Sequence, residues 1–303
     1  MGKLLVWIAA LRAPFFSATV IPVSLGAAVA WAGNGAFDLP LFLLTLAGAL
    51  CLHAGTNMMN DYHDYKSGCD LHPQYDEFWA PFFGGSRLLP QGILKPREVY
   101  VAASLSLILG SIIGMLVALQ TGWIIILLGL VGVFSGYFYV RHLSSRGLGE
   151  LFVFLNFGPL MTLGSYYAQT RMISLEPLIA SLPVGFLIAA VLWVNEIPDF
   201  PADRAVGKNT LVVRMGRKKA ADVYIIILGM SYLSVTLGAI GGYVPVYALT
   251  ALISLPLAAK AAHVARKHHD DPSRMISANV RTVQLHIVNG LLIALGYILG
   301  AIA

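Results

Sequence analysis

Continuous apolar runs occupy most of this 303-residue sequence, and each is close to the length needed to cross a lipid bilayer. A helix needs roughly 20 apolar residues to cross the hydrocarbon core. The runs do not alternate between apolar and polar residues, as the strands of a transmembrane barrel would. We therefore predict an all-α polytopic membrane protein, a bundle of nine transmembrane helices. The nine runs lie at about 14–32, 39–57, 97–118, 123–140, 149–169, 176–195, 220–240, 244–264 and 285–302.

The composition supports a membrane protein and a single domain. Hydrophobic residues make up 57% of the chain and charged residues 12%, whereas a soluble domain is typically about one quarter charged. The apolar runs follow one another without a low-complexity linker or a polar segment long enough for a soluble domain. Arg12 and Pro14 interrupt the first apolar stretch, so no cleavable signal peptide is predicted. We expect residues 1–303 to form one transmembrane domain.

The basic residues predict the orientation of the chain in the membrane. With nine spans, the N-terminus, the loops near 58–96, 141–148, 196–219 and 265–284, and the adjoining helix ends share one side. This side holds 19 of the 20 Lys and Arg residues, and only Arg171 lies opposite. The positive-inside rule places the basic side in the cytoplasm. The net charge of +5 therefore reflects membrane topology, and we expect no nucleic-acid partner.

Two clusters of Asn and Asp residues lie on the predicted cytoplasmic side. The first is NMMNDYHDYKSGCD at 57–70, and the second is NEIPDFPADRAVGKNT at 195–210. We expect both on the loops after the second and sixth spans, with Pro198 and Pro201 ending or distorting the sixth helix. Four helices separate the clusters, which suggests a duplicated four-helix unit. The candidate ligands are Asn57, Asp61 and Asp64 in the first cluster and Asn195, Asp199 and Asp203 in the second.

The spacing of these residues points to a metal site. Residues four apart share one face of a helix, so Asn57 and Asp61, like Asn195 and Asp199, can point into one cavity. Carboxylates that are close together resist joint ionisation, and a hard cation removes this conflict. Oxygen-only ligands favour Mg²⁺, which commonly bridges to substrate phosphates. A single such pattern is usually a solvated loop, but two copies at the ends of runs predict Mg²⁺ and a bound diphosphate.

The motifs resemble those of the UbiA superfamily of intramembrane prenyltransferases over nearly the whole chain. Asn195-x3-Asp199-x3-Asp203 fits the second motif of that family in full. The first motif differs, because Tyr65 stands four residues after Asp61, and either Asp64 or Asp70 completes it. The sequences NDYHDYKSGCD, RGLGE (146–150) and DRAVGKNTLVVRMG (203–216) are similar to the branch that prenylates 1,4-dihydroxy-2-naphthoate in menaquinone synthesis.

The resemblance implies a Mg²⁺-dependent transfer of a polyprenyl group from an isoprenyl diphosphate to an aromatic acceptor. Asp61, Asp64, Asp199 and Asp203, with Asn57 and Asn195, would hold Mg²⁺ and the diphosphate. Candidate cations for the leaving group are Lys66, Arg146, Lys208 and Arg214, followed by Arg12 and Arg87. Tyr137, Phe138 and Tyr139 could stabilise the allylic cation. Arg146 is expected near the acceptor's carboxylate.

Several alternatives stay open at this stage. The acceptor could be 4-hydroxybenzoate, a geranylgeranylglyceryl phosphate or haem. A membrane transporter is a rival of another class, because carboxylates and broken helices also occur there. For Glu150, a structural ion pair and a role in the acceptor site are equally favoured. His53 is expected to be a buried, hydrogen-bonded residue of the second span.

Overall fold

The computed structural model describes residues 2–74 and 85–303, and every regular element in this part of the chain is helical. The sequence forms a series of long helices joined by short turns. The first half contains α1 (Lys3–Ala10), η1 (Ala13–Phe16), α2 (Ser17–Asn34), α3 (Leu39–Ser67), η2 (Cys69–Leu71), α5 (Pro96–Thr121), α6 (Ile124–Phe138), η3 (Tyr139–Leu143) and η4 (Ser144–Arg146). The second half contains α7 (Gly149–Leu155), η5 (Asn156–Leu160), α8 (Met161–Thr170), α9 (Leu175–Ala205), α10 (Leu211–Met215), α11 (Arg217–Ile240), η6 (Val246–Ser254), α12 (Leu255–His268) and α13 (Pro272–Ile302).

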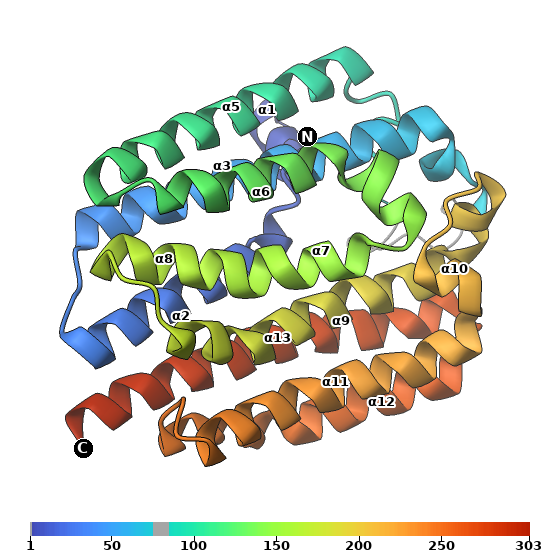
Figure 1. Cartoon of the computed structure of the whole chain (residues 1–303). Helices are drawn as coiled ribbons and strands as arrows, with labels where there is room; N and C mark the ends of the chain where they lie inside the picture. The colour runs from blue at the N-terminus through green and yellow to red at the C-terminus, as the bar shows by residue number, and fades with distance from the viewer. Residues whose placement is uncertain (1, 75–84) are drawn as a thin grey trace.

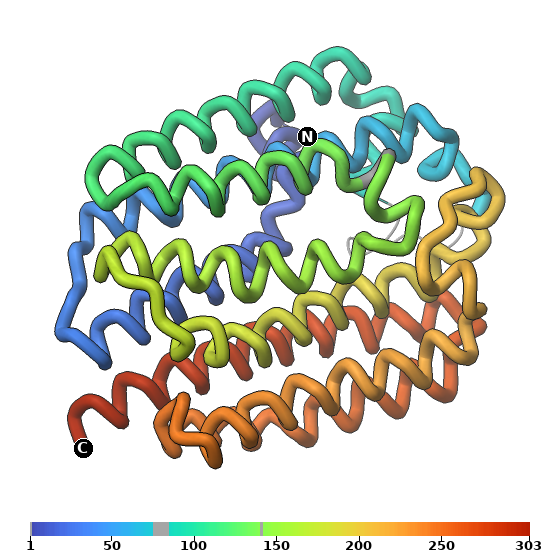
Figure 2. The backbone as a smooth tube through the Cα atoms, viewed as in Figure 1, coloured from blue at the N-terminus to red at the C-terminus, as the bar shows by residue number. Residues whose placement is uncertain are grey.

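The long helices lie side by side in one bundle (Figure 1), and the chain runs back and forth along a common direction (Figure 2). Local signals set several helix ends. Asp38 Oδ1 accepts a hydrogen bond from Leu41 N at 2.9 Å and caps the start of α3. Gly68, at φ +86°, ends the same helix in the left-handed conformation that glycine adopts without strain.

The apolar runs of the sequence are confirmed as helical segments. Seven of them are helices long and apolar enough to cross a membrane. The run at 123–140 is shorter as a helix, because α6 ends at Phe138 and continues as the π-helical turn η3. The run at 149–169 is divided into α7 and α8 by the π-helical turn η5. The count of nine membrane crossings stays a prediction.

Glycines allow the helices of the first half to approach closely. A Cβ on Gly110 of α5 would lie 2.8 Å from the Leu52 side chain and 3.0 Å from the Gly48 carbonyl oxygen, both on α3. Any larger residue would force these helices apart. Small residues at helix contacts are typical of membrane bundles, in which close packing replaces the hydrophobic driving force.

The buried side chains form several apolar clusters around the bundle. One joins α1, α3, the turn before α5, and α5, and includes Met58, Leu89 and Leu107. Another joins α9, α11, α12 and α13, and includes Leu187 and Tyr224. The ends of α3 and α9 meet at one end of the bundle, beside α10 (Figure 1). This end is where the Asn and Asp clusters lie.

Candidate active site

The two Asn and Asp clusters are helical. α3 extends to Ser67 and α9 to Ala205, so Asn57–Asp64 and Asn195–Asp203 all lie within these helices. The expectation that both clusters lie on loops is therefore wrong. At a rise of 1.5 Å per residue, the 29 residues of α3 span about 43 Å, longer than the roughly 30 Å hydrocarbon core. The acidic turns can therefore extend beyond the core while staying on a rigid helix.

Pro198 and Pro201 do not end α9, and a partner on α13 helps to explain why. Pro198 has no N–H to donate to the carbonyl of Val194, four residues earlier. Asn279 Nδ2 lies 3.5 Å from that carbonyl oxygen and 2.6 Å from Asn195 Oδ1. Asn279 is fully buried. Its amide thus supplies a donor that the proline removes, and it also orients Asn195.

Lys208 joins the two acidic clusters. Its Nζ lies 3.2 Å from Asp64 Oδ1 on α3 and 3.4 Å from Asp203 Oδ1 on α9. Asp203 Oδ1 also accepts from the Cys69 thiol at 3.2 Å. The turn after α9 folds back so that Lys208 N donates to Asp203 O at 2.9 Å. Residues separated by more than 130 positions therefore meet around a single ammonium group.

Asp61 and Asp70 face each other across Gly85. Ser86 N donates to Asp61 Oδ2 at 3.1 Å. A Cβ built on Gly85 would lie 3.2 Å from Asp61 Oδ1 and 3.0 Å from Asp70 Oδ2. Gly85 has a φ of +65°, which glycine adopts without strain. Its missing side chain leaves a small space between two carboxylate oxygens.

The charges of this cluster shift the pKa values of its members outside the long helices. Burial, followed by the neighbouring charges of Asp64 and Asp61, raises the pKa of Asp70 well above its usual range. Burial alone would lower the pKa of Lys208, but Asp203 and Asp64 outweigh this effect and raise it well above its ordinary value. The Lys208 ammonium therefore stays charged at neutral pH, while the Asp70 carboxyl resists ionisation.

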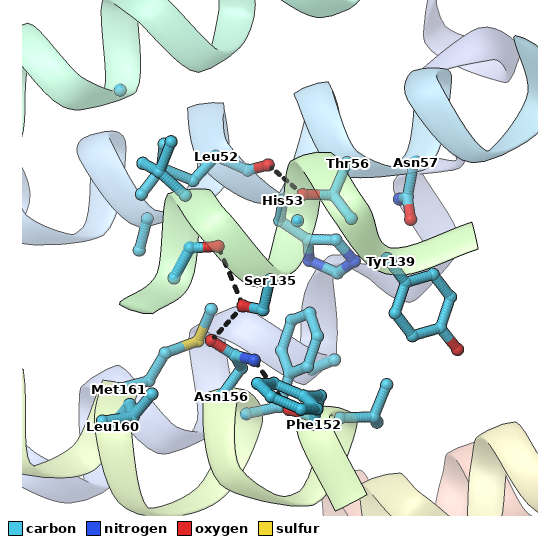
Figure 3. Close-up of a pocket in the computed structure, with 18 of the residues that line it drawn as sticks. Leu52, His53, Thr56, Asn57, Ser135, Tyr139, Phe152, Asn156, Leu160 and Met161 are labelled. Atoms are coloured by element: carbon cyan, nitrogen blue, oxygen red, sulfur yellow. Dashed lines mark hydrogen bonds between the residues drawn. The ribbon is translucent and has the colours of Figure 1, made fainter. Parts of the chain in front are cut away.

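A cavity of about 460 Å³ extends from this cluster into the bundle. Its acidic end contains Asp64, Asp70, Asp199, Asp203 and Lys208. The remainder is mainly apolar and lies between α3, α5, α6, α7, α8 and α9. Figure 3 shows part of its wall, with His53 and Asn57 from α3, Tyr139 from η3 and Asn156 from η5. The cavity thus joins a charged end to an apolar interior.

Two π-helical turns place side chains in this wall. η3 begins at Tyr139, and η5 begins at Asn156. Asn156 Oδ1 accepts from Ser135 Oγ at 3.1 Å, and its Nδ2 donates to Phe152 O at 2.7 Å (Figure 3). π-helical turns occur frequently at functional sites. Here they direct one aromatic ring and one amide into the cavity wall.

The structure brings together most of the candidate residues but leaves others outside. The candidates that line the cavity are Arg12, Asn57, Asp64, Asp70, Tyr139, Asn195, Asp199, Asp203 and Lys208. Asp61 is buried beside them through its bond to Ser86. Further candidates lie outside the cavity lining. Lys66, Tyr137, Arg146 and Arg214 are exposed, Phe138 is half-buried and Arg87 is buried.

Arg214 and Arg87 have structural bonds that the sequence did not indicate. Arg214 Nη2 donates to Arg146 O at 2.6 Å and joins the segment after α9 to the turn before α7. Arg87 Nη1 donates to Asp70 O at 2.5 Å and holds η2 in place. These two arginines therefore shape the loops around the acidic cluster.

Glu196 was missed as a site residue. It follows Asn195 directly, is 5% exposed and lines the cavity wall. The Glu196 side chain lies close to that of Glu150 on α7. Glu150 Oε1 accepts from Leu211 N at 3.3 Å. The sequence signal that could have identified Glu196 is an acidic residue in the interior of a long apolar helix.

The residues at the acidic end fit a divalent cation shared with a diphosphate. The described residues contain no group of three His, Cys, Asp or Glu side chains arranged to hold a metal by themselves. Mg²⁺ needs no such cage, because it keeps several waters and uses one or two carboxylates together with substrate phosphates. Among the described residues, Asp61 Oδ1 is buried without a hydrogen-bond partner and lies beside Gly85. This orphaned oxygen and the nearby Asp70 Oδ2 are suitable ligands.

Comparison with known proteins gives matches along most of the chain. The UbiA prenyltransferase family matches residues 19–285. The chain is 29% identical over 296 residues to 2-carboxy-1,4-naphthoquinone phytyltransferase of Synechocystis sp., covering 96% of this chain and 92% of the relative. It is 28% identical over 287 residues to 1,4-dihydroxy-2-naphthoate octaprenyltransferase of Bacillus subtilis, covering 93% and 89%.

A solved structure has the same fold. The UbiA homolog from Archaeoglobus fulgidus bound to GPP and Mg²⁺ superposes with a TM-score of 0.57 at 13% identity. The match covers 97% of this chain and 98% of that one.

Proposed function

The chain belongs to the UbiA prenyltransferase family, and from this premise we propose that it transfers a polyprenyl group from an isoprenyl diphosphate to 1,4-dihydroxy-2-naphthoate. It is a prenyltransferase enzyme and an integral membrane protein. We further propose that residues 1–303 form one domain with its active site at the cytoplasmic side. The observation that carries the proposal is the meeting of both acidic clusters at Lys208, at the mouth of an apolar cavity.

The cavity suits the donor substrate. An isoprenyl chain would lie among the apolar side chains, with its diphosphate beside Lys208 and the carboxylates. Mg²⁺, held by Asp61, Asp64 or Asp70 from the first cluster and Asp199 or Asp203 from the second, would neutralise the diphosphate. The archaeal neighbour bound to GPP and Mg²⁺ supports this arrangement. Asn57 and Asn195 would contribute amide oxygens or orient the acids.

The proposed reaction separates charge, and the residues of the cavity can stabilise both parts. The C1–O bond of the donor breaks, and its electron pair leaves with the diphosphate, which Lys208 stabilises. The ring of Tyr139, which lines the cavity, can stabilise the allylic cation. The ring carbon that bears the carboxylate then supplies the electron pair of the new C–C bond. Loss of the acceptor's carboxylate as CO₂ returns an electron pair to the ring.

The names of the relatives support a naphthoate acceptor over 4-hydroxybenzoate, a glycerol-phosphate lipid or haem. Two of them act on bicyclic naphthalene compounds according to their names, and each matches nearly the whole chain. A purified preparation with Mg²⁺ and a labelled isoprenyl diphosphate should therefore prenylate 1,4-dihydroxy-2-naphthoate. Product formation from each acceptor in turn is the measurement. Use of another acceptor with none of the naphthoate would contradict the assignment.

The proposed orientation predicts a one-sided labelling pattern. Ser67, at the end of α3, is exposed and lies beside the acidic cluster. After replacement of Cys51 and Cys69, Ser67→Cys should react with an impermeant thiol reagent only from the cytoplasmic face. Met172→Cys, an exposed position at the opposite end of the bundle, is the matched control and should react only from outside. Labelling of Ser67→Cys from outside would rule out the proposed orientation.

A further inference from the structure

We propose that Arg12 and His53 form the acceptor-binding part of the cavity, in which Arg12 binds the carboxylate of an aromatic hydroxy acid and His53 binds its ring hydroxyl. This inference rests on the proposed function, because it assumes that an acceptor enters the cavity. It replaces Arg146, which lies exposed and outside the cavity lining, as the residue that binds the carboxylate.

Arg12 is a half-buried cation at the cavity wall, and one of its donors has no partner among the described residues. It lines the cavity, and its Nε is buried without a hydrogen-bond partner among the described residues. Its backbone has φ +54° and ψ +46°, the left-handed region that is uncommon for residues other than glycine. Strained residues of this kind cluster at active and ligand-binding sites. The side chain is thus placed where a ligand can complete its bonding.

The guanidinium of Arg12 is held between an aromatic ring and a carboxylate. It stacks on the Phe15 ring, with its Cζ 4.9 Å from the ring centroid. Its Nη1 lies 3.8 Å from Asp61 Oδ1, beyond ordinary hydrogen-bonding distance. Asp61 therefore offsets part of the positive charge of Arg12 without accepting a hydrogen bond from its N–H groups. A planar guanidinium fixed in this way matches the two oxygens of a carboxylate.

His53 is a second polar group in the same wall. It is 5% exposed and lines the cavity (Figure 3). Its Nδ1 is 2.7 Å from Thr19 Oγ1, and its ring packs against Phe16 and Phe157 at centroid distances of 5.5 and 4.7 Å. Because Thr19 occupies Nδ1 and fixes the ring, Nε2 is the nitrogen that can meet a hydroxyl of a bound molecule.

His53 belongs to one continuous face of α3, and Arg12 lies against that face. His53, Asn57 and Asp61 follow at intervals of four residues, so they lie on the same helix face in successive turns. Asn57 Nδ2 donates to Leu11 O at 3.1 Å, which fastens the residue before Arg12 to the middle of that face. Arg12 therefore lies between the acidic end of the cavity and His53. An acceptor held here would be next to the donor's reacting end.

The apolar surroundings match a flat bicyclic ring. Ala18, Ile188 and Val191 form a buried cluster that Phe15 and Phe157 pack against, and all five line the cavity. A naphthalene ring buried on this surface would present its substituents to the two polar groups. The arrangement selects a ring that carries both a carboxylate and a hydroxyl, because leaving a half-buried Arg and a buried His unpaired is costly.

Binding of three stable naphthalene probes to the purified full-length protein tests this inference. 1-Hydroxy-2-naphthoate carries both groups, 1-naphthol lacks the carboxylate, and 2-naphthoate lacks the hydroxyl. Arg12→Gln should weaken 1-hydroxy-2-naphthoate about tenfold or more and leave 1-naphthol unchanged. His53→Leu should remove the preference for 1-hydroxy-2-naphthoate over 2-naphthoate. Arg97→Gln, at an exposed arginine of α5, is the matched control and should change none of the three affinities.

The same preparations separate this role from a structural one. The KM for the isoprenyl diphosphate should stay unchanged in Arg12→Gln, while the KM for the acceptor rises. If Arg12→Gln folds poorly, Arg12→Lys tests the inference instead. A single ammonium cannot bind both carboxylate oxygens in parallel, so the preference for the carboxylate probe should fall severalfold.

Three results would overturn the inference. They are an undiminished carboxylate preference in the Arg12 variants, loss of that preference in Arg146→Gln, and a defect of Arg12→Gln confined to the isoprenyl diphosphate. Prenyl transfer by the wild-type protein without any carboxylate preference would overturn this inference alone. Absence of transfer from every isoprenyl diphosphate would instead overturn the proposed function.

Discussion

Asp61→Ala and Asp199→Ala should each reduce prenyl transfer by about 10²- to 10³-fold or more while leaving the protein folded. The loss of one preorganised group that stabilises a transition-state charge has an effect of this size. Asp61 carries the orphaned Oδ1 beside the space at Gly85, and Asp199 lines the cavity from α9. Each variant removes one ligand from a different helix, so both should lose the metal-bound diphosphate.

The measurement is the initial rate of product formation with a labelled isoprenyl diphosphate, with thermal stability in detergent recorded for each variant. Asp222→Ala is the matched control. Asp222 is an exposed acid on α11 that pairs with Arg266 at 3.5 Å, outside the cavity. Its removal should cost less than twofold in rate, since surface ion pairs contribute little. Full activity in Asp61→Ala or Asp199→Ala would remove these residues from the metal site.

Chelation should stop the reaction completely, and added Mg²⁺ should restore it. Asp61, Asp64, Asp70, Asp199 and Asp203 supply only carboxylate oxygens. The positive charges of Lys208 and Arg12 cannot balance these acids together with a diphosphate. Oxygen-only ligands favour Mg²⁺ over the softer transition metals. Treatment with EDTA should abolish turnover without lowering the thermal stability, because the cavity is formed by the helices themselves.

The readout is the rate after dialysis against EDTA and stepwise addition of Mg²⁺, Ca²⁺ or Zn²⁺. Mg²⁺ should restore the original rate. Binding of the isoprenyl diphosphate, measured without acceptor, should weaken in EDTA, which gives a second readout besides turnover. Activity that persists in EDTA, or that only Zn²⁺ restores, would contradict the assignment of these acids to Mg²⁺.

The fold class could be predicted because it depends on local properties of the chain. A bilayer core fixes the length of an apolar segment, and only a helix satisfies all of its backbone hydrogen bonds within the segment. The apolar runs therefore had to be helices. The prediction was wrong for the ends of two of them, because α3 and α9 continue as helices through the acidic clusters. Pro198 is tolerated in α9 because Asn279, 81 positions later in the sequence, approaches the carbonyl that the proline leaves without a donor.

The identity of the acidic clusters also followed from the sequence, because residues four apart share a helix face in any fold. The sequence did not indicate which cations lie beside these clusters. Lys208 and Arg214 looked equivalent in the sequence, being six residues apart in one basic segment. In the structure Lys208 lies between Asp64 and Asp203, whereas Arg214 bonds to the backbone at Arg146. The direction of each side chain depends on how the turn after α9 folds against its neighbours.

The helices, the membrane environment, the family and the two acidic faces could therefore be predicted, since they depend on the pattern and spacing of residues along the chain. Only the tertiary structure decided that Asp70 faces Asp61 across Gly85, that Glu196 contacts Glu150, and that Arg12 and His53 share one wall of the cavity. These contacts join residues that lie far apart or on different elements. They exist because close helix packing brings the elements together, and no local pattern specifies which side chains then meet.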